Sequence, residues 1–529
     1  MPLMPHRASP SLGVPEVYPF DAPFSAFDFV EETFGGCPSI RRAFSLARAS
    51  GKCRSVVVEK IAATGLIQDE NEELASMGFV GGDDCLRVSF WKDRFSSHKD
   101  INAAKSSALI GYFIAKCDGK VLNCRSWHVF ESVFRKYNHP HNCVSRAASY
   151  SVRIADKVFN LPGVLYCQQN GLNKACAHVA LRALLSRIVP EGDVSYSKIN
   201  EIARNAVEDP SGYNPSDGLS TRQIESVLGA FNVSYCDMDY EAAESDGVRD
   251  IRKIHPYQND LYAGVESGMG ALLGFRLGDP ANPVSKHIIP FYGHTFNKDT
   301  WVTDAEKSYF KIGNSIGYIP SDNWTSSFIG HDDNFGSNFC VPRLYVKPEQ
   351  VDYVAALYPS GVRLTGSALG GLALLILSEI YAHIPVGNKW LSRLKAAFSG
   401  EVPQVVFRTV CVESAKYFSS LAKDSDWNGR HEDPRILEVF GAVPFPKFFQ
   451  VVEVSFPQLF AANERKIGDI VFDAGRMMPD RYSTINELPF IFARLPQIYF
   501  LMSGKDRDIN CFSTMPSSIL SHVPVLTDY

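Results

Sequence analysis

Three side chains in the middle of the sequence have the types needed for nucleophilic catalysis: Cys176, His287 and Asp304. Cys176 follows an amide-rich stretch, QQNGLN at 168–173, and precedes apolar residues at helical spacing up to Ile188. This spacing predicts that Cys176 lies in the first turn of an amphipathic, largely buried helix. The unpaired N–H groups and the positive dipole end at a helix start favour a thiolate, which is the nucleophilic form of cysteine.

The histidine and the aspartate are expected on one hairpin. His287 opens an apolar run, HIIPFY, and a short polar turn leads from there to a second run, WVTD at 301–304. Two antiparallel strands of these lengths would place Asp304 beside His287, where a carboxylate fixes the tautomer and orientation of the imidazole. His287 would then be the base or ion-pair partner of Cys176. His294 is the alternative base, because it also precedes the turn.

An oxyanion formed at Cys176 would need hydrogen-bond donors from the helix start and from an amide side chain in the preceding loop. Gln169 is one candidate for the amide donor. Gln168 and Asn173 are alternatives, and the sequence leaves the choice among the three open.

The order of these motifs resembles that of the papain-like cysteine peptidase superfamily, and within it the double-glycine peptidases that process bacteriocin leaders. The resemblance rests on the amide loop with its cysteine, the distant histidine strand, the Trp-Val-x-Asp run, and DGLSTRQIESVLGAFNVSY at 217–235. It covers residues 160–345. It implies a papain-like core that hydrolyses a peptide or isopeptide bond, with Cys176 as nucleophile, His287 as base, Asp304 as the orienting residue and Gln169 at the oxyanion.

Two other functions are consistent with the same residues: a transglutaminase-like acyltransferase or deamidase, and a papain-like scaffold that binds without catalysis. The G-x-S-x-G pattern at 313–317 does not predict a serine nucleophile, because Pro320 disfavours the helix that must follow it. Cysteine and histidine residues between 117 and 143 fit no standard zinc spacing, so neither a metal nor a cofactor is expected. The acidic pair Asp332-Asp333 is interpreted as a solvated turn.

Composition excludes several classes of protein. With 53 Lys+Arg and 58 Asp+Glu, the net charge of −5 lacks the basic excess that binds nucleic acid. The longest apolar run, 368–377, is too short to span a membrane and predicts a buried helix. The N-terminus lacks a continuous apolar signal region and the 12 cysteines include no CxxC, which favours a cytoplasmic location.

The 529 residues suggest several domains and an α+β fold. Residues 1–35 are expected to form an extended arm and 36–159 an N-terminal β-rich accessory domain. The papain-like core at 160–345 would be followed by a C-terminal mixed α/β accessory domain at 346–529. Because these flanks are long for a bare peptidase, we expect them to select a protein or peptide substrate, or to cover the cleft until a regulatory protein partner binds.

Overall fold

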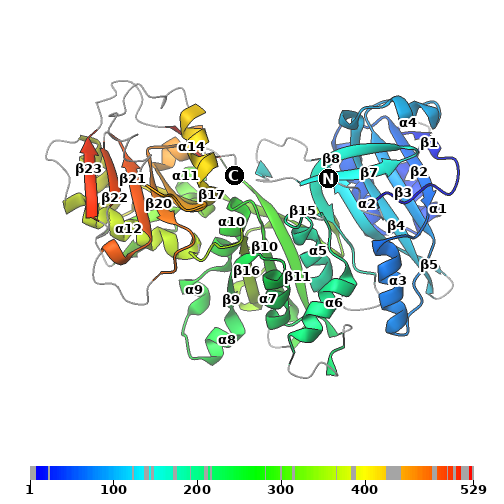
Figure 1. Cartoon of the computed structure of the whole chain (residues 1–529), viewed down its shortest axis with the longest axis horizontal. Helices are drawn as coiled ribbons and strands as arrows, with labels where there is room; N and C mark the ends of the chain where they lie inside the picture. Colours follow the sequence, from blue (N-terminus) through cyan, green and yellow to red (C-terminus); the bar gives the residue numbers. More distant parts are fainter. Residues whose placement is uncertain are drawn as a thin grey trace.

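A computed structural model of the chain shows a mixed α+β architecture built on three large sheets. Figure 1 shows the sheets in a row, with the N-terminal and C-terminal ones at opposite ends and the central one between them. The residues that the structure describes are 7–21, 24–121, 124–135, 142–143, 148–170, 176–190, 192–207, 212–214, 217–279, 282–297, 301–312, 316–364, 366–382, 389–423, 443–478, 485–496, 498–503, 508–513 and 523–526.

The N-terminal sheet is antiparallel, and successive residues on its strands point to opposite faces. Helices α1 (Ala26–Phe34) and α2 (Pro38–Ala49) pack on one face, and α3 (Leu66–Ser76) and α4 (Lys99–Ala103) on the other. The strands, in spatial order, are β1 (Glu16–Pro19), β2 (Ser55–Ile61), β3 (Cys85–Trp91), β4 (Leu109–Val121), β5 (Cys124–Phe134), β8 (Lys157–Tyr166) and β7 (Ala148–Ile154).

The expected extended arm at 1–35 is partly regular structure. Strand β1 joins the sheet, and α1 begins where the Ser25 side chain accepts a hydrogen bond from the Asp28 N–H. The helix buries Val30 and Phe34 against the sheet, so the apolar residues of this segment have a core to enter. The prediction of a wholly extended arm is therefore wrong.

The central sheet carries helices on both faces. Helices α5 (Cys176–Leu185), α6 (Tyr196–Asn205) and α7 (Thr221–Ala230) pack on one face. The other is covered by α8 (Tyr240–Ser245), α9 (Ile251–Ile254) and α10 (Tyr257–Glu266). The strands, in spatial order, are β15 (Gly336–Pro342), β14 (Ser327–Asp332), β11 (Asn282–Thr295), β10 (Ala271–Asp279), β16 (Val351–Tyr358) and β9 (Ser234–Asp239), and β6 (Asn142–Cys143) also pairs with β11.

The C-terminal sheet is covered on one face by α12 (Gly366–Ala382) and α13 (Lys389–Ser399). Helices α14 (Ser414–Lys423) and α16 (Pro457–Asn463) also belong to this region, and β19 (Arg465–Lys466) pairs with β24 (Val523–Pro524). The strands, in spatial order, are β12 (Phe310–Ile312), β13 (Ile316–Pro320), β17 (Val406–Glu413), β18 (Phe448–Ser455), β20 (Gly468–Asp473), β21 (Phe490–Leu495), β22 (Ile498–Ser503) and β23 (Asp508–Ser513).

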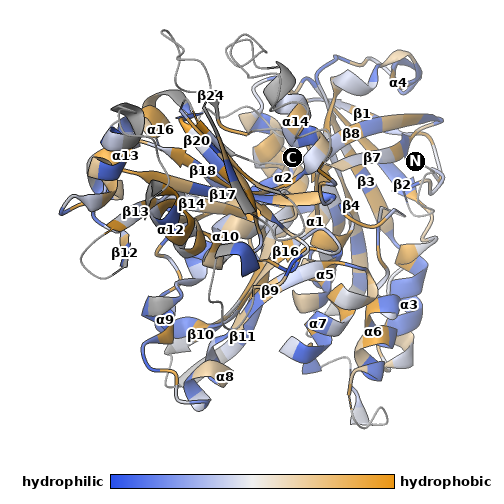
Figure 2. Ribbon diagram, turned by 60° about the vertical axis from the view of Figure 1, so that its left-hand side comes forward, coloured by the Kyte–Doolittle hydropathy of each residue, from blue (hydrophilic) through white to orange (hydrophobic). Residues whose placement is uncertain are grey.

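The apolar run at 368–377 lies within α12 and is buried in the C-terminal core, as the sequence predicts. Within the described part of the chain, no helix combines the length and apolar character that a membrane span requires. Figure 2 shows apolar residues gathered on the sheets, while the outer helix α3 is largely hydrophilic.

The three sheets exchange strands across the expected domain limits. Strand β8 extends the N-terminal sheet to Tyr166, and β16 returns to the central sheet after residue 345. Strands β12 and β13 come from the central stretch of sequence but belong to the C-terminal sheet. The central sheet is thus tied to both neighbours by the path of the chain as well as by packing.

Candidate active site

Cys176 is the first residue of α5, at the helix start that the sequence predicts. Its neighbours Ala177, Ala180 and Leu181 are buried in the core between α5 and the central sheet. Cys176 itself is only half-buried. The helix therefore fixes the backbone of the cysteine in the core while its thiol remains partly accessible.

His287 lies on β11 and is buried close enough to Cys176 for the thiol to affect its pKa. Its Nε2 atom is 3.1 Å from Asp333 Oδ1 and 3.7 Å from Asp332 Oδ2. Burial alone lowers the pKa of His287, but Asp332, Asp333 and the Cys176 thiol together raise that pKa to about 12. The imidazole is consequently a buried cation at neutral pH.

The Nε2 nitrogen of His287 faces the carboxylates, and the Asn334 side chain lies 3.5 Å from it. The Cys176 thiol acts on the same imidazole, so Cys176, His287 and Asp333 are the set of residue types used for thiol activation. A cationic imidazole next to a thiol can stabilise the thiolate and later release a proton to a leaving group.

The two carboxylates lie where β14 turns into β15, Asp332 as the last residue of β14 and Asp333 as the first of the turn, and both are buried. Asp332 Oδ1 accepts hydrogen bonds from the backbone N–H groups of Asn334, at 2.8 Å, and Phe335, at 3.2 Å. Burial acts to raise the pKa of Asp332, but His287 and these N–H groups lower it. The interpretation of Asp332-Asp333 as a solvated turn is therefore wrong, because the turn folds back onto β11 and α5.

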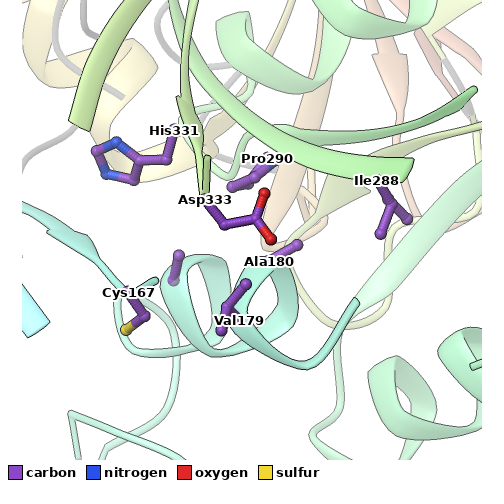
Figure 3. A pocket seen from close by; sticks show the side chains of 8 residues that line it. Cys167, Val179, Ala180, Ile288, Pro290, His331 and Asp333 are labelled. Carbon is purple, nitrogen blue, oxygen red and sulfur yellow. The ribbon is translucent and has the colours of Figure 1, made fainter. Parts of the chain in front are cut away.

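Figure 3 shows the Asp333 carboxylate above Val179 and Ala180 of α5. A cavity of about 10 Å³ separates the helix from the strands at this point, room for no more than about one water molecule. Buried Pro290 and His331 also line it. The carboxylate side of the site is thus closely packed, which restricts the positions that Asp333 can take.

The structure does not bring Asp304 to His287. Residues 301–304 do not form the expected strand: Asp304 lies in the short helix α11 (Val302–Ala305), where its exposed side chain pairs with Lys307. Strand β11 is already paired with β10 on one side and with β14 and β6 on the other, so neither edge is free for a hairpin partner at 301–304. Among the residues described, no hydrogen bond or ion pair joins Asp304 to His287.

The alternative base, His294, lies at the C-terminal end of β11, where its side chain is bound by other residues. It is buried, and its Nε2 lies 2.6 Å from Glu266 Oε1, while the other Glu266 oxygen pairs with Arg408 of β17. His294 therefore belongs to a network of polar contacts between the central and C-terminal sheets. Its ring nitrogens are both engaged, since Nδ1 lies 3.0 Å from the Thr295 carbonyl oxygen.

The three oxyanion candidates differ in their hydrogen bonds. Gln168 Oε1 accepts the backbone N–H of Val129 at 2.9 Å, so this side chain is committed to strand β5. Asn173 lies outside the described residues. Gln169 is half-buried, and no hydrogen bond joins its side chain to a residue in the described ranges. Gln169 thus stays the predicted amide donor.

The His287, Asp332 and Asp333 side chains could also hold a divalent metal, because their ligand atoms all lie within 4.8 Å of one another. A protonated His287 competes with this, since metal binding requires the neutral imidazole. Several cysteines and histidines between 117 and 143 have side chains of the types that bind zinc. His128 pairs with Asp118, the Nδ1 to Oδ2 distance being 2.6 Å. His139 and His141, and the side chains of Cys124 and Cys143, lie outside the described residues.

Ser315 of the G-x-S-x-G pattern also lies outside the described residues, and the segment that follows it is strand β13 and not a helix.

The buried charge on His287 predicts a pH-dependent stability. Folded His287 keeps its proton to about pH 12, whereas the unfolded chain releases it near the ordinary pKa of 6.5. Its contribution to the free energy of unfolding is therefore complete below pH 6.5 and declines as the pH rises towards 12. We expect the urea midpoint of wild type to exceed that of His287→Gln by the most near pH 6, and by less at about pH 9. A pH-independent difference in unfolding curves would contradict this assignment of charge.

Comparison of the chain with protein-family models, with curated proteins and with solved structures finds no match.

Proposed function

We propose that this chain is a cysteine hydrolase with a papain-like core, acting on a peptide or isopeptide bond. The observation that carries the proposal is one arrangement: Cys176 at a helix start lies by a buried His287 whose Nε2 is held by Asp333. In this proposal Asp333 takes the orienting role that the sequence suggested for Asp304.

The proposed reaction proceeds by acyl transfer. The Cys176 thiolate attacks the carbonyl carbon, and the resulting oxyanion is stabilised by the backbone N–H at the start of α5 and by the Gln169 amide. The carbon–nitrogen bond breaks as protonated His287 gives its proton to the leaving amine. Neutral His287 then takes a proton from water, which attacks the thioester and releases the acid and the thiol.

A cytoplasmic location and a protein or peptide substrate belong to the same proposal. Ten cysteines within the described ranges are free thiols, which fits a reducing compartment, and the proposed nucleophile requires a reduced sulfur. If an amine replaces water in the second step, the same residues perform acyl transfer instead of hydrolysis.

The proposal can be tested by mapping which cysteine reacts first with substoichiometric iodoacetamide. Cys340 and Cys511 are exposed, and burial of parts of their side chains raises the pKa of both. If accessibility alone set the rate of alkylation, these two cysteines would react faster than half-buried Cys176. We expect Cys176 to be alkylated at least about tenfold faster, because among the cysteines with described side chains its thiol alone is near a cationic imidazole.

The measurement is the rate of carbamidomethylation of each cysteine peptide by mass spectrometry, with and without EDTA. Equal or slower reaction at Cys176 would indicate a binding scaffold without an activated thiol. Unchanged reaction with EDTA is the expected result, whereas a large change would favour the metal-binding alternative at His287, Asp332 and Asp333.

A further inference from the structure

The amide side chains of the loop that leads to Cys176 are hydrogen-bonded to the N-terminal domain, while the first loop residue, Cys167, also packs with Val179 of α5. Strand β8 ends at Tyr166, and the described part of the loop, 167–170, contacts β5 and α3. Three consecutive amide side chains occupy this loop, and two of them are bound to the N-terminal domain. The third is Gln169.

Gln168 is anchored to β5 by two hydrogen bonds. Its backbone N–H donates to the Val129 carbonyl oxygen at 2.9 Å, and its side-chain Oε1 accepts the Val129 N–H at 2.9 Å. The Cys37 thiol, at the start of α2, is 3.8 Å from the same Oε1 atom. The residue before Gln169 therefore behaves as an extension of the N-terminal sheet.

Asn170 is anchored to α3 through a buried ion pair. Its Nδ2 donates to Glu70 Oε1 at 3.1 Å, and Glu70 Oε2 accepts from Lys116 Nζ of β4 at 2.6 Å. All three residues are at most 7% exposed. Burial acts to raise the pKa of Glu70, but Lys116 lowers it, so the carboxylate is charged when it holds Asn170. Because both charges are desolvated, their geometry is tightly determined, and the residue after Gln169 is fixed with them.

The same domain also contacts the carboxylate side of the candidate active site. Arg42 of α2 donates to the carbonyl oxygens of Ser337, at 3.1 Å, and Asn338, at 2.6 Å, directly after the Asp333 turn. The Tyr166 hydroxyl donates to the Ser39 hydroxyl at 2.9 Å and lies 3.4 Å from the Asp333 carbonyl oxygen. The N-terminal domain thus touches the site from both sides.

We propose that Gln168 and Asn170 are positioning residues that fix the backbone on both sides of Gln169 to the N-terminal domain, so that this domain sets the oxyanion-binding geometry of the site. The inference rests on the proposed function, because it assigns Gln169 the role of oxyanion donor. It gives the N-terminal domain a part in the chemistry itself, beyond substrate selection or covering of the cleft.

Two reactions of the same thiol separate positioning of the oxyanion loop from activation of the thiol. Alkylation by iodoacetamide forms a carbon–sulfur bond as iodide leaves and generates no oxyanion. Acylation by p-nitrophenyl acetate passes through a tetrahedral oxyanion before p-nitrophenolate leaves. The ratio of the acylation rate to the alkylation rate therefore reports on the oxyanion donors alone.

The test uses the full chain with Gln168→Met and Asn170→Leu, which remove one anchor each at nearly constant volume. We expect the rate ratio to fall about 10- to 100-fold in each variant, as for displacement of a donor by about 1 Å. The rate of alkylation at Cys176 and its dependence on pH should match wild type, because the thiol and His287 are untouched. Glu72→Gln, on the exposed face of α3, is the matched control and should change neither rate.

The possible outcomes are distinguishable. An unchanged ratio in the folded variants, or an equal loss of both rates, overturns the inference while the proposed function stands. If wild type and Cys176→Ala react with the ester at the same rate, the proposed function fails and the inference falls with it. Thermal unfolding followed by circular dichroism shows which variants are folded, and the milder Gln168→Met provides the test if loss of the Asn170 anchor unfolds the loop region.

Discussion

Cys176→Ala is expected to abolish acylation by p-nitrophenyl acetate, with a loss of about 10⁴-fold or more in the rate of p-nitrophenolate release. The loss follows from removal of the only thiol that contacts His287 among the cysteines the structure describes. Stability should change little, because Cys176 is half-buried at the end of its helix and alanine is a good helix former. Stopped-flow absorbance measures the initial burst of p-nitrophenolate that accompanies acylation, and mass spectrometry identifies the acetylated residue.

Cys340→Ala is the matched control for this experiment, since it removes an exposed thiol in strand β15. It should retain the full burst. Retention of the burst by Cys176→Ala, or acetylation found mainly on another residue, would be incompatible with Cys176 as nucleophile.

The second large effect is expected at Asp333. Asp333→Leu removes the acceptor of the His287 Nε2 proton and should lower the acylation rate about 10²- to 10⁴-fold. Asp333→Asn keeps an oxygen acceptor but loses the negative charge, so we expect a smaller loss and a lower pKa for His287. The alkaline limit of the acylation rate should then move to lower pH.

Asp304→Asn gives the contrast that separates the two possible third members. Its carboxylate is exposed and paired with Lys307, so acylation should stay within about twofold of wild type. Rate–pH profiles for the three variants provide the measurement. A loss at Asp304 as large as that in Asp333→Leu would restore the hairpin assignment and count against the buried turn.

The local features of the site could be predicted from the sequence. The apolar spacing after Cys176 and the Ser220–Gln223 capping box each specify a helix start within a few residues, and both helices begin as predicted. His287 also lies on the expected strand, because the run of apolar residues that follows it indicates a strand buried on both faces.

The partner of His287 could not be predicted in the same way, because it depends on contacts between distant segments. Pairing of β11 with β14 brings the Asp332-Asp333 turn to His287, and no periodicity encodes which strands pair. The signal that was available is the sequence Asp332-Asp333-Asn334, which lies between two apolar runs and contains residues that favour a tight turn. WVTD at 301–304 was too short to distinguish a strand from the helical turn that it forms.

The position of the Asp333 turn far along the chain has a consequence for biosynthesis. Cys176 leaves the ribosome long before residue 333, and at roughly 5–20 residues per second the interval is about 8 to 30 seconds. The N-terminal sheet is complete by Tyr166 and can begin to fold at once, whereas His287 and then its carboxylate partners are made only later in that interval. A nascent chain therefore presents a cysteine without its activating residues, and the thiol gains its reactive environment only near the end of translation of the central sheet.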